Sequence, residues 1–358
     1  MTYPQCQKQK TQFLLNLLCT DTGQLCISPW NLASWKFPFK MVNPVLDEDT
    51  EELEEYQHLM KNPKYFQPYG KAHIKELGRL SQGMPGGVGG TNTIFFINIL
   101  SVPVECWRDV TYGCGVVNYH QEKLNPYRTH LTVGGNQVIH PGDCGTPTVD
   151  LLTVKLLINN VISTTDTNFV TIDIKDFHLK THMYRYECMP LKLSNRPKHL
   201  FQQYNLVFKV TKYGYVYIEI RCGMNGFPQA GLPAQQLLKK RLNKKSYQKN
   251  ELTRYFWKYY WRPISLTLCV EDFCAKYIGK QHAKHLMAVV NEHYFISSDW
   301  DGKRYLGLYL DWDYTNPKFH LSMLAYVADA LKGFHHKRPQ KPQDQPYPHV
   351  KKVYGAKA

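Results

Sequence analysis

The chain has 358 residues, of which 43% are hydrophobic and 13% aromatic. This composition excludes a disordered chain and provides a large core, enough for two subdomains. The charge is strongly basic, with 44 Lys and Arg against 29 Asp and Glu, and the residues after position 55 hold 40 basic and 21 acidic side chains. A folded body with this surplus suits a polyphosphate ligand such as nucleic acid, although ribosomal, membrane-peripheral and ordinary soluble basic proteins share the feature.

Cysteine spacing and the length of apolar runs exclude further classes. None of the ten cysteines forms a C-x-x-C pair, so we expect reduced, mostly buried thiols and no zinc knuckle. The longest apolar stretches, Phe13 to Cys19 and Thr93 to Leu100, are far shorter than the roughly 20 residues that span a bilayer, and no secretory signal is visible. These features predict an intracellular protein, cytoplasmic or nuclear, with no membrane partner.

The N-terminal part of the chain gives weak signals. Residues 1–48 show no clear period and are treated as an extension of unknown structure. A glycine-rich segment, Gly83 to Gly90, has no following Lys-Ser or Lys-Thr pair as a phosphate-binding P-loop requires. It predicts a loop before an apolar strand, Ile94 to Leu100.

The pattern becomes clearer after residue 145. Thr146 as N-cap and Pro147 as first helical residue predict a helix from Pro147 to about Ser163, with Val149, Leu152, Leu156 and Val161 facing the core. Alternation from Phe169 to Ile174 then predicts a strand that places Val170, Ile172 and Ile174 on one face and Thr171 and Asp173 on the other.

The following elements complete an α+β pattern. They are a strand at 215–220, a helix at about 232–242, strands at 266–270 and 273–278 joined by a tight turn at Glu271 and Asp272, a helix at 281–294, and a hairpin of strands 305–312 and 319–322. The order strand, helix, hairpin, helix, strand pair resembles a split βαβ sheet with helices on one face.

Three carboxylates occupy positions that such a sheet brings together. Nucleotidyl transfer uses two divalent ions about 3.5 to 4 Å apart, and hard ions such as Mg²⁺ or Mn²⁺ prefer carboxylate oxygens. The end of the first strand holds Asp173, and the central hairpin turn holds Glu271 and Asp272. On spacing alone, a strand-end acid and a polar turn are the favoured interpretation.

Five stretches in order carry a family resemblance: Arg128 to Gly135 (RTHLTVGG), Thr171 to Phe177 (TIDIKDF), Gly223 to Gly231 (GMNGFPQAG), Cys269 to Asp272 (CVED) and Arg304 to Leu308 (RYLGL). In this order, they resemble five motifs of copia-type LTR retrotransposon reverse transcriptases. The motifs are the fingers strand Ala-Arg-Leu-Val-Ala-Lys-Gly, the first catalytic Asp motif, Leu-Tyr-Gly-Leu-Lys-Gln-Ala, Tyr-Val-Asp-Asp, and the strand Tyr-Phe-Leu-Gly-Ile that grips the primer. The resemblance covers roughly Glu54 to Phe334.

The resemblance implies a right-hand polymerase fold and an RNA-directed DNA polymerase that uses two Mg²⁺ or Mn²⁺ ions. Its partners would be an RNA or DNA template with a primer, and deoxynucleoside triphosphates. The metal ligands would be Asp173, Glu271, Asp272 and the carbonyl of Ile174. Nucleotide binding would involve Arg128, Phe177, His178 and Gln229, and nucleic-acid binding would involve Tyr305, Leu306 and Gly307 together with a basic cluster of Lys239, Lys240, Arg241 and Lys244.

The implied subdivision is an extension at 1–48, a fingers-like region at 49–168, a palm at 169–322, and a partial thumb or connection with a basic tail at 323–358. The family usually continues into a ribonuclease H domain, and the resemblance ends before one. Template preference and oligomeric state are not indicated by the sequence.

Three residues depart from the family pattern. Glu271 replaces an aspartate and adds one methylene, which displaces its carboxylate by about an ångström in a site sensitive to small shifts. His178 stands where Tyr or Phe blocks a ribose 2′-hydroxyl, and His130 replaces a fingers arginine and is largely neutral at pH 7.

Two alternatives to an active polymerase follow. One is a non-catalytic nucleic-acid-binding remnant of such a polymerase, and the other is an RNA-recognition module on the same sheet, whose stacking motif is not found here. His282 and His285 could share a metal ion, but an exposed polar helix face is the favoured interpretation. The basic cluster could equally be a solvated helix end.

Overall fold

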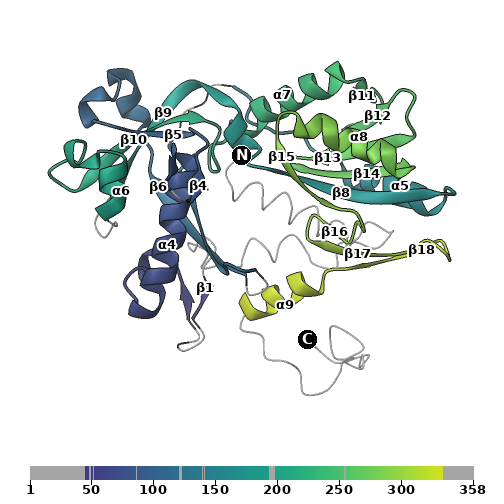
Figure 1. Cartoon of the computed structure of the whole chain (residues 1–358), viewed down its shortest axis with the longest axis horizontal. Coiled ribbons are helices and arrows are strands. Elements are labelled where there is room, and N and C mark those ends of the chain that lie inside the picture. The colour runs from purple at the N-terminus through teal and green to yellow at the C-terminus, as the bar shows by residue number, and fades with distance from the viewer. Residues whose placement is uncertain are drawn as a thin grey trace, which may run out of the picture. The chain divides into compact units, whose positions relative to one another are not determined.

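In a computed structural model of the chain, the described residues are 45–333, apart from 48, 49, 51, 86, 121, 122, 139, 141, 193–197 and 254. The predicted N-terminal extension and C-terminal tail therefore lie almost entirely outside the described residues. The chain divides into two compact units, Met1–Gly302 and Lys303–Ala358. The described residues combine helices with antiparallel sheets, which confirms the α+β class (Figure 1).

The largest element of the first unit is a six-stranded antiparallel sheet in the order β11-β12-β13-β14-β8-β15. Within it, the chain runs β8, α7, β13, β14, α8, β15, which is the order of a split βαβ sheet. Its strands are β8 (Thr167–Lys175), β11 (Tyr247–Lys249), β12 (Phe256–Tyr259), β13 (Ile264–Cys269), β14 (Asp272–Ile278) and β15 (Phe295–Asp299).

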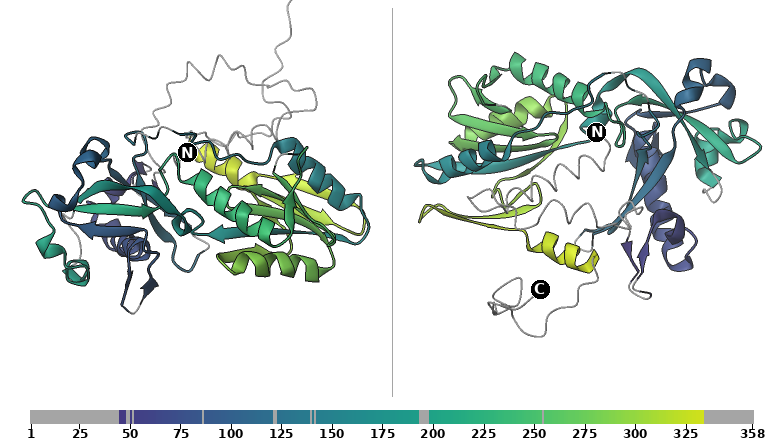
Figure 2. Two further views of the ribbon diagram at one scale, coloured as in Figure 1. Left: turned by 90° about the horizontal axis from the view of Figure 1, so that it is seen from above. Right: turned by 180° about the vertical axis from the view of Figure 1, so that it is seen from behind.

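Two helices, α7 (Gly231–Lys244) and α8 (Lys280–Asn291), cover one face of this sheet. Alternate residues of β8, namely Val170, Ile172 and Ile174, share a buried core with residues of both helices. On the opposite face, Lys276 of β14 binds Asn160 and Thr164, at the C-terminal end of α5 (Leu151–Ile162). Figure 2 shows α5 across the sheet from α8.

The start of α5 and its buried face differ from the prediction. Asp150, not Thr146, is the N-cap, and its carboxylate accepts the backbone N–H of Thr153 at 2.7 Å. Leu152 and Leu156 are 66% and 57% exposed, whereas Val154, Leu157, Ile158 and Val161 are buried. Val149, which set the phase of the predicted face, precedes α5, and the residues that share the buried face are spaced i, i+3, i+4 and i+7 from Val154.

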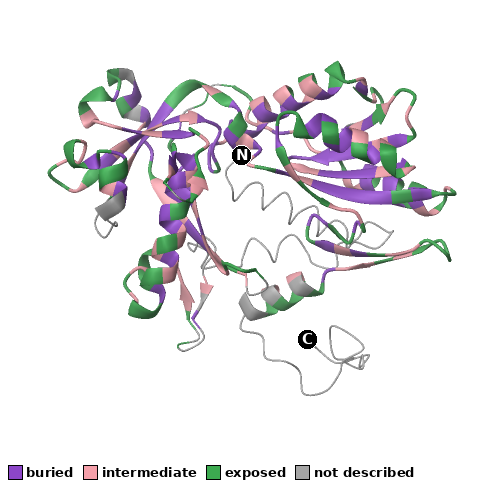
Figure 3. Cartoon of the chain, in the orientation of Figure 1, coloured by how far each residue is buried: buried purple, intermediate pink, exposed green. Residues whose placement is uncertain are grey.

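Two smaller sheets and a long helix form the rest of the first unit. Strands β5 (Ile94–Ile97), β10 (Tyr215–Cys222) and β9 (His182–Lys192) form one sheet, and β6 (Gly113–Tyr119) pairs with β7 (Tyr127–Val133). Helix α4 (Pro63–Leu80), which the sequence did not predict, places Ile74, Leu77 and Leu80 against Leu131 and Val133 of β7. Figure 3 shows the buried residues gathered along these contacts.

Several shorter elements link these sheets. The glycine-rich segment forms a small hairpin, β3 (Gly83–Met84) with β4 (Val88–Gly89), where a loop was predicted. Before α4, strands β1 (Val45–Leu46) and β2 (Leu53–Glu54) pair and α3 (Tyr56–Leu59) follows. A short helix, α6 (Lys198–Gln203), lies between β9 and β10.

The described part of the second unit contains β16 (Arg304–Tyr305), β17 (Leu308–Asp313), β18 (Lys318–Ser322) and α9 (Leu324–Gly333). The predicted hairpin across 315–317 is present, since Asp313 pairs with Lys318. The predicted strand 305–312 is instead broken at Leu306 and Gly307, whose φ values of 51° and 85° form a two-residue turn of the type I′ pattern.

Candidate active site

The central feature of the site is a pair of aspartates on neighbouring strands. Asp173 of β8 lies directly opposite Asp272 of β14, in a register that also pairs Ile172 with Phe273. Directly opposite side chains on antiparallel strands have Cβ atoms about 4.5 to 5.5 Å apart. Ser297 of β15 donates a hydrogen bond to Asp173 Oδ2 at 3.2 Å. The carboxylates of Asp173 and Asp272 are therefore neighbours on the face of the sheet opposite α7 and α8.

A tight turn positions Glu271 beside this pair. Cys269 pairs with Asp272, which leaves Val270 and Glu271 as the two turn residues. Val270 has a φ of 60°, and a positive φ at the first central residue only is the pattern of a type II′ turn, where Gly is preferred. A β-branched residue in this region is strained by about 1–3 kcal/mol. The carbonyl of Glu271 accepts the N–H of Ile174 at 3.1 Å, which fastens the turn to β8.

The aspartate pair fits one mode of divalent-ion binding. Among the described residues, no three His, Cys, Asp or Glu side chains form a metal-binding group. Mg²⁺, however, is commonly held by one or two carboxylates, with waters and substrate phosphates completing the shell. Asp173 and Asp272 supply those two carboxylates, so the residues present fit an ion that is shared with a phosphate substrate.

The predicted nucleotide-binding residues Phe177 and His178 lie next to the loop 223–231. Phe177 is 3% exposed and packs in the sheet core beside Tyr294, so its ring belongs to the core rather than to an open pocket floor. The half-buried His178 follows it in the chain. A Cβ on Gly223 would lie 2.8 Å from the His178 carbonyl oxygen, which shows how closely the loop packs there.

The same loop contacts the end of β7. The N–H of Val133 donates to the carbonyl of Asn225 at 2.9 Å, and Gly226, with a φ of 108°, leaves no room for a Cβ beside Val133. Gln229, in this loop, is 6% exposed. Within the described part of the chain its Oε1 accepts no hydrogen bond, and a buried acceptor of this kind generally has a partner. A ligand donor would satisfy it.

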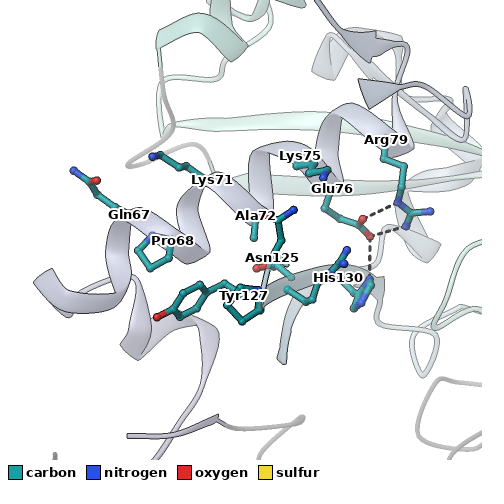
Figure 4. Close-up of a pocket in the computed structure, with 13 residues that line it drawn as sticks. Gln67, Pro68, Lys71, Ala72, Lys75, Glu76, Arg79, Asn125, Tyr127 and His130 are labelled. Atoms are coloured by element: carbon teal, nitrogen blue, oxygen red, sulfur yellow. Dashed lines mark hydrogen bonds and ion pairs between the residues drawn. The ribbon is translucent and has the colours of Figure 1, made fainter. Parts of the chain in front are cut away.

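A pocket of about 420 Å³ lies between α4 and β7 (Figure 4). Four basic side chains line it, namely Lys71, Lys75, Arg79 and Arg128. The predicted nucleotide-binding residue Arg128 is therefore part of a larger basic site, most of which comes from the unpredicted helix. Lys71, Lys75 and Arg79 recur every four residues, and this spacing is the signal that could have revealed one basic helix face.

A charge network joins this pocket to the loop that follows Asp173. Arg79 donates to Glu76 Oε2 at 2.8 Å and also pairs with Asp176. Nδ1 of His130 lies 3.6 Å from Glu76 Oε1. Burial alone would raise the pKa of Glu76, but hydrogen bonds and charge from His130 and Arg79 outweigh it and lower this pKa. Arg79 thus connects the pocket wall with the segment between Asp173 and Phe177.

The basic cluster on α7 lies away from the aspartates. Its helix packs on the face of the sheet opposite Asp173 and Asp272. Lys239 lies 5.0 Å from the ring of Tyr255 and Arg241 lies 4.8 Å from the ring of Tyr294, while Lys240 and Lys244 are exposed. Burial and repulsion by Lys249 lower the pKa of Lys239.

Other predicted candidates have structural contacts. The hydroxyl of Tyr247 bonds His285 Nδ1 at 3.0 Å, and His282 Nδ1 lies 3.4 Å from an Arg262 nitrogen. Burial and the nearby cations lower the pKa of His285. Tyr305, Leu306 and Gly307 form the β16–β17 turn in the second unit.

Comparisons with known proteins add no relative. No family model matches the chain, and no curated protein is similar to it. In the part of the chain that the structure describes, no helix combines the length and apolarity needed to cross a membrane.

Proposed function

We propose that the chain is a reverse transcriptase, an RNA-directed DNA polymerase with a right-hand fold in which the six-stranded sheet is the palm. The observation that carries the proposal is the register that sets Asp173 opposite Asp272. Two neighbouring carboxylates are the ligands that a divalent ion shared with a phosphate substrate uses, and this supports the proposal.

The surrounding residues support the same function. The β6–β7 hairpin with α4 would be the fingers, and its basic pocket offers Arg128, Arg79, Lys71 and Lys75 to phosphate groups. The loop 223–231, with Gln229, lies against both β7 and the His178 segment. Residues from distant parts of the sequence therefore contact the segment that follows Asp173, and template, primer and nucleotide would bind beside it.

The reaction would depend on positioning and on charge neutralisation. Asp173 and Asp272, with the Ile174 carbonyl, would hold divalent ions, which activate the primer hydroxyl and neutralise the reacting phosphate. Arg128 would orient the triphosphate as a fork-shaped donor. Arg79 would hold the Asp176 loop, and through it the position of Asp173 relative to the pocket.

A second candidate is a nucleic-acid-binding remnant without polymerase activity. It is favoured by Glu271, whose extra methylene sits in a turn already strained at Val270. In that case the basic surface would still bind nucleic acid while the carboxylates no longer align the ions.

The deciding experiment is extension of a primed RNA template with Mg²⁺ and deoxynucleotides. The expected result is extension that is lost on metal removal and in Asp173→Asn. The matched control is Asp143→Asn, an exposed aspartate whose bond from the Gly145 N–H an asparagine oxygen also accepts. Binding of primer-template without any extension would favour the remnant, and absence of binding would contradict both candidates.

A further inference from the structure

One segment outside the proposed active site combines positive charge with aromatic side chains. Residues 239–262 contain nine Lys and Arg, one acidic residue, and seven Tyr, Phe and Trp. Aromatic faces interleaved with cations are what single-stranded nucleic acid requires, since bases stack on rings while phosphates are neutralised.

The structure separates these aromatic residues into two groups. Trp257 and Tyr247 are 1% and 0% exposed and belong to the sheet core. Tyr260 and Trp261, in the turn between β12 and β13, are 75% and 73% exposed. Their rings are 4.7 Å apart and nearly perpendicular, at 84°. Core packing therefore explains the first group. The second group lies outside the core, where the rings of Tyr260 and Trp261 contact each other and Trp261 also contacts Tyr259, and most of their surface is exposed.

Cations lie on the strands that lead into this turn. Lys258 is exposed and pairs in register with Ser265, which pairs in turn with Lys276. Burial and repulsion by Lys258 lower the pKa of Lys276, so these two lysines reinforce a positive potential. Arg262, at the other end of the turn, lies 5.3 Å from the ring of Tyr259. We name Lys258, Tyr260, Trp261 and Arg262 the turn platform.

The composition favours nucleic acid over a protein partner or a membrane. Protein interfaces are enriched in Tyr, Trp and Arg but depleted of lysine, and lysine provides six of the nine cations of this segment. Membrane-surface segments bury a broad aliphatic face, and the turn platform contains no aliphatic side chain. The charge complements a phosphate backbone, and the exposed rings complement bases.

We propose that the turn platform is a second binding site for single-stranded nucleic acid, in which bases stack on Trp261 and Tyr260 and phosphates lie beside Lys258 and Arg262. It lies at the opposite end of β13 from the Val270–Glu271 turn. That strand has six residues, so the two sites are about 20 Å apart at about 3.4 Å per residue. Binding at the platform therefore requires neither divalent metal nor the aspartates.

The test measures the affinity of the full chain for fluorescein-labelled oligonucleotides by anisotropy, without divalent metal. The probes are a short oligo-uridine, an oligo-thymidine and an abasic strand of equal length. The double variant Tyr260→Ala/Trp261→Ala is expected to bind RNA and DNA about 10- to 100-fold more weakly, because stacking on one aromatic ring is worth that order of affinity per base. The abasic strand should bind parent and variant alike.

Three controls make the result specific. Trp261→Phe should retain most of the affinity, since it keeps an aromatic face. Tyr213→Ala removes a tyrosine elsewhere that is 72% exposed and has Lys212 over its ring, and it should have no effect. Lys258→Ala should reduce the slope of log affinity against log salt by about 0.7, the value for one phosphate of a single strand.

The outcomes separate this proposal from the polymerase. Asp173→Asn should bind the oligonucleotides as the parent does, and a chain that lacks polymerase activity should still show platform binding. Equal affinity of the double variant and the parent would overturn the proposal. The proposal would also be overturned if the parent does not bind the oligonucleotides and the double variant instead loses self-association or binding to vesicles with anionic lipid.

Discussion

Two groups of carboxylates in the first unit have opposite charge environments. Glu76 and Asp176 share the guanidinium of Arg79, and Glu76 also contacts His130. Asp173 and Asp272, by contrast, face each other across neighbouring strands. The first arrangement balances charge and stabilises the contact between α4, β7 and the segment after β8. The second sets like charges directly opposite each other, an arrangement that by itself disfavours strand pairing and is typical of a functional site.

This difference predicts how substitution in each group should change stability and activity. Removing a carboxylate from the balanced network should destabilise the fold, because a cation or a buried partner is left behind. Removing one from the aspartate pair should stabilise the fold and abolish activity. Stability and activity measured together therefore test the comparison.

The largest expected effect is that of Asp173→Asn on primer extension, which should fall to background because one metal ligand is lost. In chelator, the same variant should be more stable than the parent by about 0.2–1 kcal/mol, since repulsion by Asp272 is relieved. Asp176→Asn is the matched substitution and should lower stability by about 1 kcal/mol, because Arg79 loses an ionic partner. Urea unfolding measures both. Equal stability changes in the two variants would refute the comparison.

The next effect is an increase in polymerase activity in Glu271→Asp. Charge is preserved, so the difference is geometric: the longer side chain displaces its carboxylate, and shifts of this size can cost about 10²-fold in rate. Single-turnover extension with saturating nucleotide measures the change. If the variant binds primer-template and remains inactive, His178 or His130 limits the site instead, and the remnant becomes the better description.

A third prediction concerns Arg79→Ala, which should lower the free energy of unfolding by about 3 kcal/mol because the 7% exposed side chain of Glu76 loses its main cation. Lys75→Ala, at an exposed position of the same helix, should change stability by less than about 0.5 kcal/mol. The double variant Glu76→Gln/Arg79→Ala should recover part of the loss. No recovery would show that the arginine acts through packing and not through charge.

Part of the six-stranded sheet could be predicted from sequence because its signals are local. Strands β8, β13 and β14 were predicted, whereas β11, β12 and β15 were not, and the predicted strand pair within 305–322 forms a separate sheet. Strand β8 alternates from Val170 to Ile174, and Gly223, Gly226 and the acidic pair 271–272 mark the ends of elements. The turn itself is Val270–Glu271 rather than the predicted Glu271–Asp272, because Asp272 pairs with Cys269. The juxtaposition of Asp173 and Asp272 followed from the topology of a split βαβ sheet alone. Register and the strain at Val270 depend on pairing across the sheet and had no sequence signal.

Helix α4 was missed because the first half of its buried face carries Tyr65, Tyr69 and His73, and aliphatic residues follow only in its second half. It also contains Pro63 and Pro68. The start of α5 was wrong for a tertiary reason. The carbonyl of Pro147 accepts a bond from Gln235, and Thr146 packs against Gly231 at the start of α7. The residues that resembled a helix cap therefore contact another helix. Because α4 was missed, three of the four basic residues of the pocket were also missed.

The smallest expected effect is on the pH dependence of stability. Because Arg79 and His130 outweigh burial and lower the pKa of Glu76 below its ordinary value of 4.5, the unfolded chain binds this proton more tightly than the folded chain does. The resulting stability is fully present above about pH 4.5 and is lost as the pH falls through the folded-state pKa. Glu76→Gln should therefore show a shallower loss of unfolding free energy below pH 4.5 than the parent, measured by urea titration at several pH values. Asp143→Asn, at an exposed site, should keep the parent's slope of unfolding free energy against pH. An unchanged slope in Glu76→Gln would mean that Arg79 and His130 do not stabilise the ionised carboxylate. In that case Asp176 alone would carry the contrast with the aspartate pair.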